Sequence, residues 1–163
     1  MRSFTATTTI DRPAAEAWAI VADYHCDPQW RHGVETMAPS TTGPAVVGTT
    51  TAEVLRLGGR TYRNAGLVTE VQSGSRLAWR TVAGADAFGS RDVRPSGSAA
   101  CTVTLELHVR YHGGQRLAAP LLTGMLRRGL RRDLARLAAL VVDRAPPGQS
   151  VPCGPEVAGR SVA

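Results

Sequence analysis

A single aspartate inside an apolar helical stripe is the side chain of this sequence best suited to acid–base chemistry. Between Leu117 and Arg144, leucines recur at helical spacing. On a helix that turns about 100° per residue, Asp133 lies roughly 20° from Leu126 and so shares the face of the leucines. A carboxylate facing an apolar hollow either pairs with a cation or has its pKa raised, as a general base requires. Asp133 is therefore a candidate catalytic residue, with anchoring of the helix as the structural alternative.

Two histidines, His25 and His32, flank a short predicted helix that carries Trp30. Imidazoles titrate near neutral pH, so either could move protons in a condensation or a dehydration. Neither has a visible partner in the sequence, and histidines are common in surface loops. The pattern therefore favours no catalytic role for them.

Motifs for covalent, metal or cofactor chemistry are missing from the sequence. No nucleophile elbow, phosphate-binding loop, dinucleotide fingerprint or HExxH motif occurs. Cys26, Cys101 and Cys153 are an odd set without a CxxC pair, which predicts reduced thiols and argues against a disulfide framework or a zinc site. We expect no metal and no cofactor.

Size and composition predict one globular domain. A chain of 163 residues, with 43% hydrophobic and 20% charged residues, can bury a substantial core. No apolar run reaches membrane-spanning length, and the N-terminus lacks the apolar segment of a secretory signal. The expected location is the cytoplasm, and the sequence leaves open a monomer or a homodimer.

The positive charge of the chain is carried by arginine alone. The formal net charge is +6, and all 19 basic residues are arginine. Five of them fall on the face of the last predicted helix opposite its leucines, where a solvated charged face is expected: Arg127, Arg128, Arg131, Arg132 and Arg136. Because no aromatic–basic interleaving or recognised binding motif accompanies them, we predict no nucleic-acid partner.

The first elements along the chain are a strand and two short helices. Alternating residues predict a strand over 3–10. Pro13, tolerated in a first helical turn, then opens a helix to about Ala22. Asp27-Pro28 repeats the signature of a helix start, so a second, very short helix follows.

The rest of the chain reads as hairpins followed by one long helix. Turn residues recur between Val-, Thr- and Leu-rich runs, which is typical of consecutive antiparallel hairpins. The clearest strand covers 101–111, because apolar and polar residues alternate along it. The long helix covers about 117–144, and residues 145–163 are predicted to be a flexible tail.

With this order of elements, the sequence resembles the SRPBCC or START-like helix-grip superfamily, in particular its polyketide cyclase/dehydrase-like group. The resemblance covers about 3–143 and depends on the order of several short pieces: Ile10-Asp11-Arg12-Pro13 with Glu16 and Trp18, Asp23, Trp30, Val68-Thr69-Glu70-Val71 leading to Arg76-Leu77-Ala78-Trp79, Val93-Arg94-Pro95, and Asp133-Leu134-Ala135-Arg136-Leu137.

The resemblance implies an α+β helix-grip fold in residues 1–144. A curved antiparallel sheet of about seven strands is expected to wrap around the long C-terminal helix, with two short helices after the first strand and an apolar cavity inside. The rival cystatin-like cone places its helices first and ends in strands. The long C-terminal helix argues against that rival.

Arg91 departs from the pattern of the resembling sequences, which place an inward-facing aromatic side chain at this point of the strand. A guanidinium could hold a carboxylate, phosphate or enolate oxygen through two parallel hydrogen bonds. A bulge that turns Arg91 to solvent is the open alternative. If both Arg91 and Asp133 point inward, we expect them to form a buried pair across the cavity, and both are candidate catalytic residues.

Aromatic and leucine side chains are the candidates for the cavity wall, since flat rings suit a polycyclic ligand. The predicted ligand-binding residues are Trp30, Tyr62, Trp79, Arg91, Leu126 and Leu130. Plain core packing is the alternative for Trp79.

The resemblance implies that a hydrophobic or polycyclic small molecule binds in the cavity, with a cofactor-independent polyketide cyclase/dehydratase of bacterial secondary metabolism as the leading interpretation. Whether the chain is an enzyme stays open. A non-catalytic lipid or small-molecule carrier or sensor is the alternative, distinguished by a wholly apolar cavity. A ribosome-linked or toxin–antitoxin member of the superfamily, suited to the basic helix face, is a third possibility.

Overall fold

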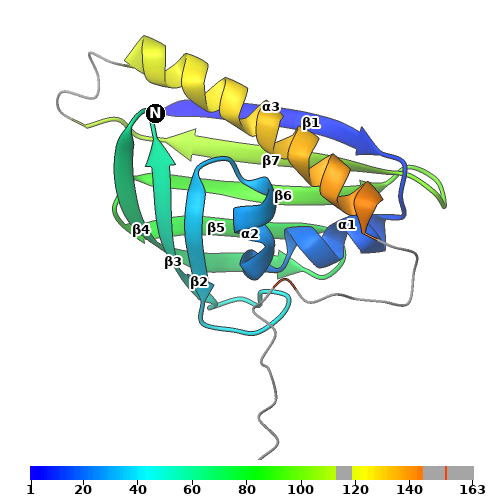
Figure 1. Ribbon diagram of the computed structural model, residues 1–163. Coiled ribbons are helices and arrows are strands. Elements are labelled where there is room, and N and C mark those ends of the chain that lie inside the picture. Colours follow the sequence, from blue (N-terminus) through cyan, green and yellow to red (C-terminus); the bar gives the residue numbers. More distant parts are fainter. Residues whose placement is uncertain (113–118, 145–152, 154–163) are drawn as a thin grey trace, which may run out of the picture.

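The structure, a computed structural model, describes residues 1–112, 119–144 and 153 (Figure 1). Most of the predicted flexible tail, 145–163, therefore lies outside the described residues. The same is true of residues 117–118, where the long helix was expected to begin.

Seven strands form one antiparallel sheet in the order β1-β7-β6-β5-β4-β3-β2. The strands are β1 (Arg2–Ile10), β2 (Val34–Pro39), β3 (Thr50–Leu57), β4 (Arg60–Gln72), β5 (Arg76–Ala83), β6 (Ala87–Pro95) and β7 (Cys101–Val109). From β2 to β7 each strand pairs with the next along the chain, as consecutive hairpins require, and β1 closes the order by pairing with β7. Bulges in β4 bend the sheet around its concave face.

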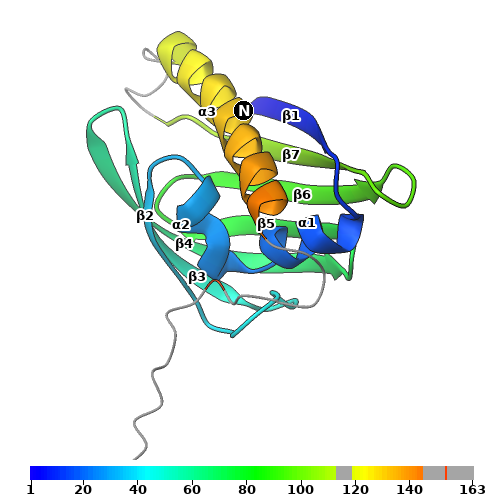
Figure 2. The ribbon, with the colours of Figure 1, turned by 45° about the vertical axis from the view of Figure 1, so that its right-hand side comes forward.

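The helices lie on that concave face. α1 (Ala14–Val21), the single-turn 3₁₀ helix η1 (Tyr24–Cys26) and α2 (Asp27–Trp30) follow β1, and α3 (Ala119–Asp143) follows β7. Figures 1 and 2 show α3 lying obliquely along β1 and β7, with α1 and α2 near its C-terminal half. The predicted helix-grip fold is confirmed.

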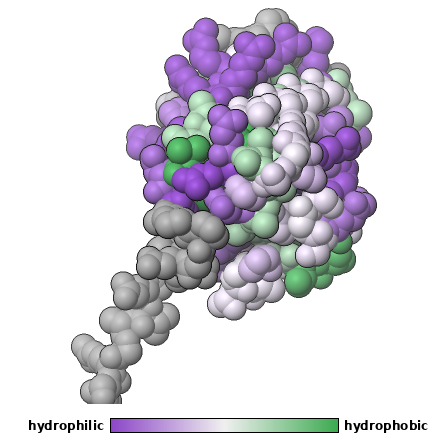
Figure 3. All heavy atoms as spheres, turned by 90° about the vertical axis from the view of Figure 1, so that its right-hand side faces the viewer, coloured by the Kyte–Doolittle hydropathy of each residue, from purple (hydrophilic) through white to green (hydrophobic). Residues whose placement is uncertain are grey.

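Apolar periodicity in the sequence accounts for this packing. On β7, Cys101, Val103 and Leu105 are buried, while the intervening threonines are partly exposed. The buried positions of α3 are Leu130, Leu134, Leu137 and Val141, at the helical spacing expected of a core face. On the face that Figure 3 draws, hydrophobic side chains appear only in small patches.

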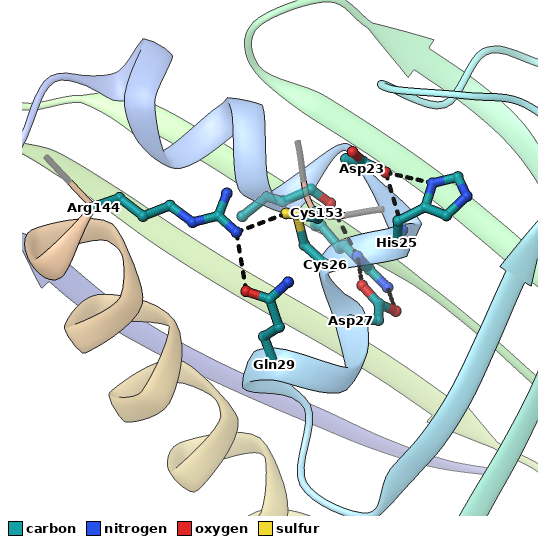
Figure 4. The surroundings of a disulfide bond; sticks show 9 residues. Asp23, His25, Cys26, Asp27, Gln29, Arg144 and Cys153 are labelled. Atoms are coloured by element: carbon teal, nitrogen blue, oxygen red, sulfur yellow. Dashed lines mark hydrogen bonds and ion pairs between the residues drawn. A yellow bond between two sulfur atoms is a disulfide. The ribbon is translucent and has the colours of Figure 1, made fainter. Parts of the chain in front are cut away.

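A disulfide bond joins Cys26 of η1 to Cys153 (Figure 4). The two Cα atoms are 4.8 Å apart and are separated by 127 residues along the chain. The prediction of reduced thiols was therefore wrong for these two cysteines, because pairing over so long a separation leaves no spacing signal. Cys101 is a buried free thiol, as predicted. Disulfides are uncommon in reducing compartments, so the cytoplasmic location stays a prediction.

Within the described ranges, no helix has the length and hydrophobicity needed to cross a bilayer.

Candidate functional site

A pocket of about 960 Å³ lies among the concave face of the sheet, α3 and the η1–α2 segment. Pockets of roughly 300–1,000 Å³ hold drug-sized ligands. All six residues predicted to bind a ligand line it, and so does the second catalytic candidate: Trp30, Tyr62, Trp79, Arg91, Leu126, Leu130 and Asp133. The sequence thus located the wall of the pocket, and contact with a ligand stays a prediction for each of these residues.

Arg91 points inward from the middle of β6. It pairs with Leu77 of β5 and Leu105 of β7, in ladders that continue without a register shift on either side. The residue is only 4% exposed. The alternative of a bulge that turns this side chain to solvent is therefore wrong.

The partner of Arg91 is Asp27, the first residue of α2. Two parallel hydrogen bonds join them, from Nη1 to Oδ1 at 2.8 Å and from Nη2 to Oδ2 at 2.6 Å. Nη1 also donates to the carbonyl oxygen of Val21 at 2.9 Å. The predicted fork geometry of Arg91 is thus present, but it is directed at a protein carboxylate.

Two aromatic rings enclose the Arg91 guanidinium. Its central carbon lies 4.4 Å from the ring centroid of Tyr24 and 5.1 Å from that of Trp30. Burial opposes the charge, but the favourable interactions, led by the charge of the Asp27 carboxylate, together outweigh burial, and the pKa of Arg91 is raised. The guanidinium is therefore a permanent cation inside the fold.

The predicted pair between Arg91 and Asp133 is wrong. Asp133 accepts a hydrogen bond from the backbone N–H of His32 at 2.7 Å, while Arg91 is bound to Asp27. The sequence alone could not show whether Asp27 or Asp133 pairs with Arg91, because Asp27 is already explained as a helix-start residue. Burial raises the pKa of Asp133, and the His32 N–H and the Arg31 charge only partly oppose that shift.

A second arginine extends the ion pair across the pocket. Arg31 Nη1 donates to Asp27 Oδ2 at 3.0 Å and to Glu53 Oε1 of β3 at 2.7 Å. Asn64 of β4 donates to Glu53 Oε2 at 2.8 Å. Two cations and two carboxylates therefore form one network that connects β6, α2 and β3 and ends on an amide of β4.

Sequence reasoning missed Asp27, Arg31 and Glu53 as members of the site. Two signals were present. Asp27 and Arg31 are four residues apart, the spacing of a helical ion pair. Glu53 is a charged residue among the inward-facing residues of β3. It lies opposite Asn64 of β4, two positions from the pair that Leu55 forms with Tyr62.

The two candidate histidines differ in position. His32 lines the pocket. His25 is absent from the pocket wall, and its Nδ1 lies 3.0 Å from Oδ1 of Asp23, the residue that caps η1 by accepting from the His25 backbone N–H (Figure 4). A role for His25 at the pocket is not supported by this placement.

One group of potential metal-binding atoms occurs in the part of the chain that the structure describes, formed by Asp23, Cys26 and Cys153. Both sulfur atoms belong to the disulfide, so neither is available as a thiolate ligand. The expectation of no metal stays a prediction.

Comparisons with known proteins agree with this architecture. A family model described as "Polyketide cyclase / dehydrase and lipid transport" matches residues 1–142. A comparison with curated proteins found no match.

Solved structures share the fold at low sequence identity. A protein from Thermus thermophilus is 16% identical, with a TM-score of 0.78 over 89% of this chain and 100% of that one. The Zhui aromatase/cyclase of a Streptomyces species is 14% identical, with a TM-score of 0.72 over 90% of this chain and 96% of that one. A START superfamily protein from Mycobacterium smegmatis is 14% identical, with a TM-score of 0.70 over 86% and 97%.

Proposed function

The chain belongs to the polyketide cyclase/dehydrase and lipid transport family, and we propose that it binds a hydrophobic or polycyclic small molecule and catalyses its cyclisation or dehydration, as a cofactor-independent enzyme of bacterial secondary metabolism. The observation that carries the proposal is the pocket of about 960 Å³, which combines aromatic and leucine walls with a charged network.

The polar groups in the pocket favour an enzyme over a carrier. A carrier needs little more than an apolar lining, whereas this wall contains Arg31, Glu53, Asn64 and Asp133. Burial raises the pKa of Asp133 toward the range of a general base. These charged groups cost desolvation free energy, which a purely apolar carrier would avoid.

The reaction that we propose is an intramolecular aldol condensation. The Asp133 carboxylate removes a proton from a carbon next to a carbonyl group of the ligand. That carbon then bonds to a second carbonyl carbon of the same molecule, and the resulting alkoxide takes up a proton. Loss of the hydroxyl group with one further hydrogen releases water. The pocket contributes by holding the two carbons close together.

Binding is tested by native mass spectrometry of the purified protein, looking for a co-purifying ligand that is lost from a variant with a filled pocket. Leu126→Trp adds bulk to the pocket wall, and Val82→Trp places the same bulk on a side chain that is 53% exposed. We expect the ligand to be lost from Leu126→Trp alone. Equal retention by both variants contradicts binding in this pocket.

Catalysis is tested with a linear 1,5-diketone, which condenses to a cyclohexenone with loss of water. We expect wild-type protein to accelerate ring formation, and Asp133→Asn to abolish the acceleration while retaining the ligand in native mass spectra. Ligand binding without any acceleration would favour the carrier.

A further inference from the structure

We infer that Cys26 and Cys153 form a redox site that exchanges reversibly with dithiols and disulfides, and that reduction of this pair weakens ligand binding in the pocket. Among the residues that the structure describes, neither cysteine lines the pocket, so this site is separate from it. The effect on ligand affinity rests on the proposed function, whereas the chemistry of the two cysteines does not.

The two sulfur atoms differ in their access to solvent. Cys26 is 0% exposed, whereas Cys153 is partly exposed. A thiolate from solvent can therefore reach the sulfur of Cys153 but not that of Cys26. In thiol–disulfide exchange, the attacked sulfur enters a mixed disulfide and the other sulfur leaves. Cys153 is thus the exchanging cysteine, and Cys26 is the resolving cysteine that completes the reaction from inside the fold.

A guanidinium next to Cys153 favours the same assignment. Arg144, the residue after α3, donates from Nη2 to Sγ of Cys153 at 3.0 Å and to Oε1 of Gln29 at 2.9 Å (Figure 4). A neighbouring cation stabilises a thiolate, which is the form of cysteine that attacks a disulfide. The carboxylate of Asp23 lies within 4.8 Å of both sulfur atoms and does not distinguish them. In the reduced protein, Cys153 therefore carries the reactive thiolate.

The exchange balances with a dithiol as the reductant. One thiolate of the dithiol attacks Sγ of Cys153, and the sulfur of Cys26 leaves and takes up a proton. The second thiol of the dithiol then attacks the mixed disulfide, and Cys153 leaves as a thiolate beside Arg144. The protein disulfide gains two electrons, and the dithiol loses two electrons and becomes a disulfide. Oxidation by an external disulfide runs through a mixed disulfide on Cys153 in the opposite direction.

Cys26 lies in the segment that forms one wall of the pocket. Tyr24 of this segment lines the pocket, and Asp27, which binds Arg91, follows Cys26 directly. η1 and α2 have three and four residues, so their own hydrogen bonds are too few to hold them in place. The disulfide ties this segment to Cys153, and reduction leaves noncovalent contacts as its anchors. A ligand that contacts the segment should therefore bind the oxidised protein more tightly.

The roles of the cysteines are tested with dithiobis(nitrobenzoate), which releases one coloured thionitrobenzoate at each exchange. Reduced wild-type protein should release two equivalents and re-form its disulfide. Cys26→Ser should release one and keep a mixed disulfide on Cys153, detected by mass spectrometry. Cys153→Ser should release none on the same timescale, because Cys26 and Cys101 are buried.

Arg144→Met should slow the first release about threefold, because the smaller thiolate fraction is partly offset by the higher nucleophilicity of a less stabilised thiolate. Arg144→Lys keeps the positive charge and should restore the rate. Circular dichroism establishes that each variant is folded. Release from Cys153→Ser at the wild-type rate, a single equivalent from wild type, or an unchanged rate in Arg144→Met contradicts the assignment.

The effect on the pocket is tested with N-phenylnaphthylamine, an uncharged polycyclic amine whose fluorescence rises in apolar surroundings. We expect its Kd to be about fivefold higher for wild type reduced with dithiothreitol than for oxidised wild type. This value is at the low end of typical coupling between sites, because the ion pairs of Asp27 persist after reduction. Linkage also requires that saturating probe shift the equilibrium between protein and dithiothreitol toward the protein disulfide by the same factor.

Cys153→Ser is the control for the reductant, since its affinity for the probe should not respond to dithiothreitol. Equal affinity of oxidised and reduced wild type, or a disulfide equilibrium that the probe does not shift, overturns the inference while the proposed function stands. Absence of probe binding to oxidised wild type, or equal binding by Leu126→Trp, contradicts the proposed function and with it the effect of reduction on the pocket.

Discussion

Replacing Asp27 with asparagine should destabilise the fold more than any other isosteric change of a carboxylate in this chain. Asp27 is fully buried and accepts from both Nη atoms of Arg91 and from Nη1 of Arg31. Asparagine keeps one acceptor oxygen but turns an NH₂ donor toward a guanidinium donor. It also leaves the network with two cations against one carboxylate.

The expected loss is about 3–5 kcal/mol of unfolding free energy, because removing one member of a buried ion pair leaves a charge uncompensated. Asp92→Asn is the control, since Asp92 bonds Arg76 at 2.6 Å where the arginine side chain is 33% exposed. Solvent partly screens this pair, in which the aspartate side chain is 13% exposed, so its loss should cost less, about 1 kcal/mol. Urea unfolding followed by circular dichroism measures both, and with a slope of about 2 kcal/mol per molar the Asp27→Asn midpoint should fall by about 2 M.

The cause is tested by adding Arg91→Met to Asp27→Asn. If the loss comes from an uncompensated guanidinium, the double variant should be more stable than the sum of the two single losses implies. Strict additivity, or an Asp27→Asn midpoint no lower than that of Asp92→Asn, would refute the electrostatic explanation of the network.

Three further predictions concern other parts of the fold. Burial raises the folded-state pKa of Asp133, so the protonated carboxyl group stabilises the fold fully below the unfolded pKa of 3.8, and this stabilisation is lost as pH rises through the folded pKa. Asp133→Asn should therefore gain stability relative to wild type between pH 4 and pH 7 in urea titrations. A difference in stability that does not change with pH would contradict this. Cys153→Ser should lower the free energy of unfolding by about 2–5 kcal/mol, since it removes the disulfide. Added reductant should lower the stability of wild type to that of the variant and leave the stability of the variant unchanged. Gly89→Ala should destabilise by a few kcal/mol, because its Cβ would meet the backbone oxygen of Glu106, whereas Gly124→Ala on α3 meets nothing within 4 Å and should stabilise by about 0.5–1 kcal/mol in thermal melts.

The sequence predicted the elements that local periodicity controls. Alternation over β7 and the leucine spacing of α3 placed a buried face correctly on each, and Asp133 lies on the pocket side of α3 as the wheel indicated. These features depend on residues two to four positions apart, so they can be read from a single chain.

Pairings between distant residues escaped prediction. Arg91 finds Asp27 across 64 residues, and Cys26 finds Cys153 across 127. Nothing local distinguishes Asp27 from other helix-start aspartates, because its second role appears only when β6 passes beneath α2. The sequence could therefore narrow the Arg91 side chain to two orientations, inward or toward solvent, but it could not identify the partner of Arg91.

The pairing of β1 with β7 sets an order of events during synthesis. Arg2 lies opposite Val109, so the first strand leaves the ribosome long before the strand that completes its hydrogen bonds. In the meantime its backbone amides are open to other nascent chains, as in any unpaired edge. Five of its residues carry hydroxyl groups: Ser3, Thr5, Thr7, Thr8 and Thr9. This polar composition lowers the tendency of the unpaired segment to self-associate. The hairpins from β2 to β7 can form first, and β1 and α3 can complete the domain once α3 has been synthesised.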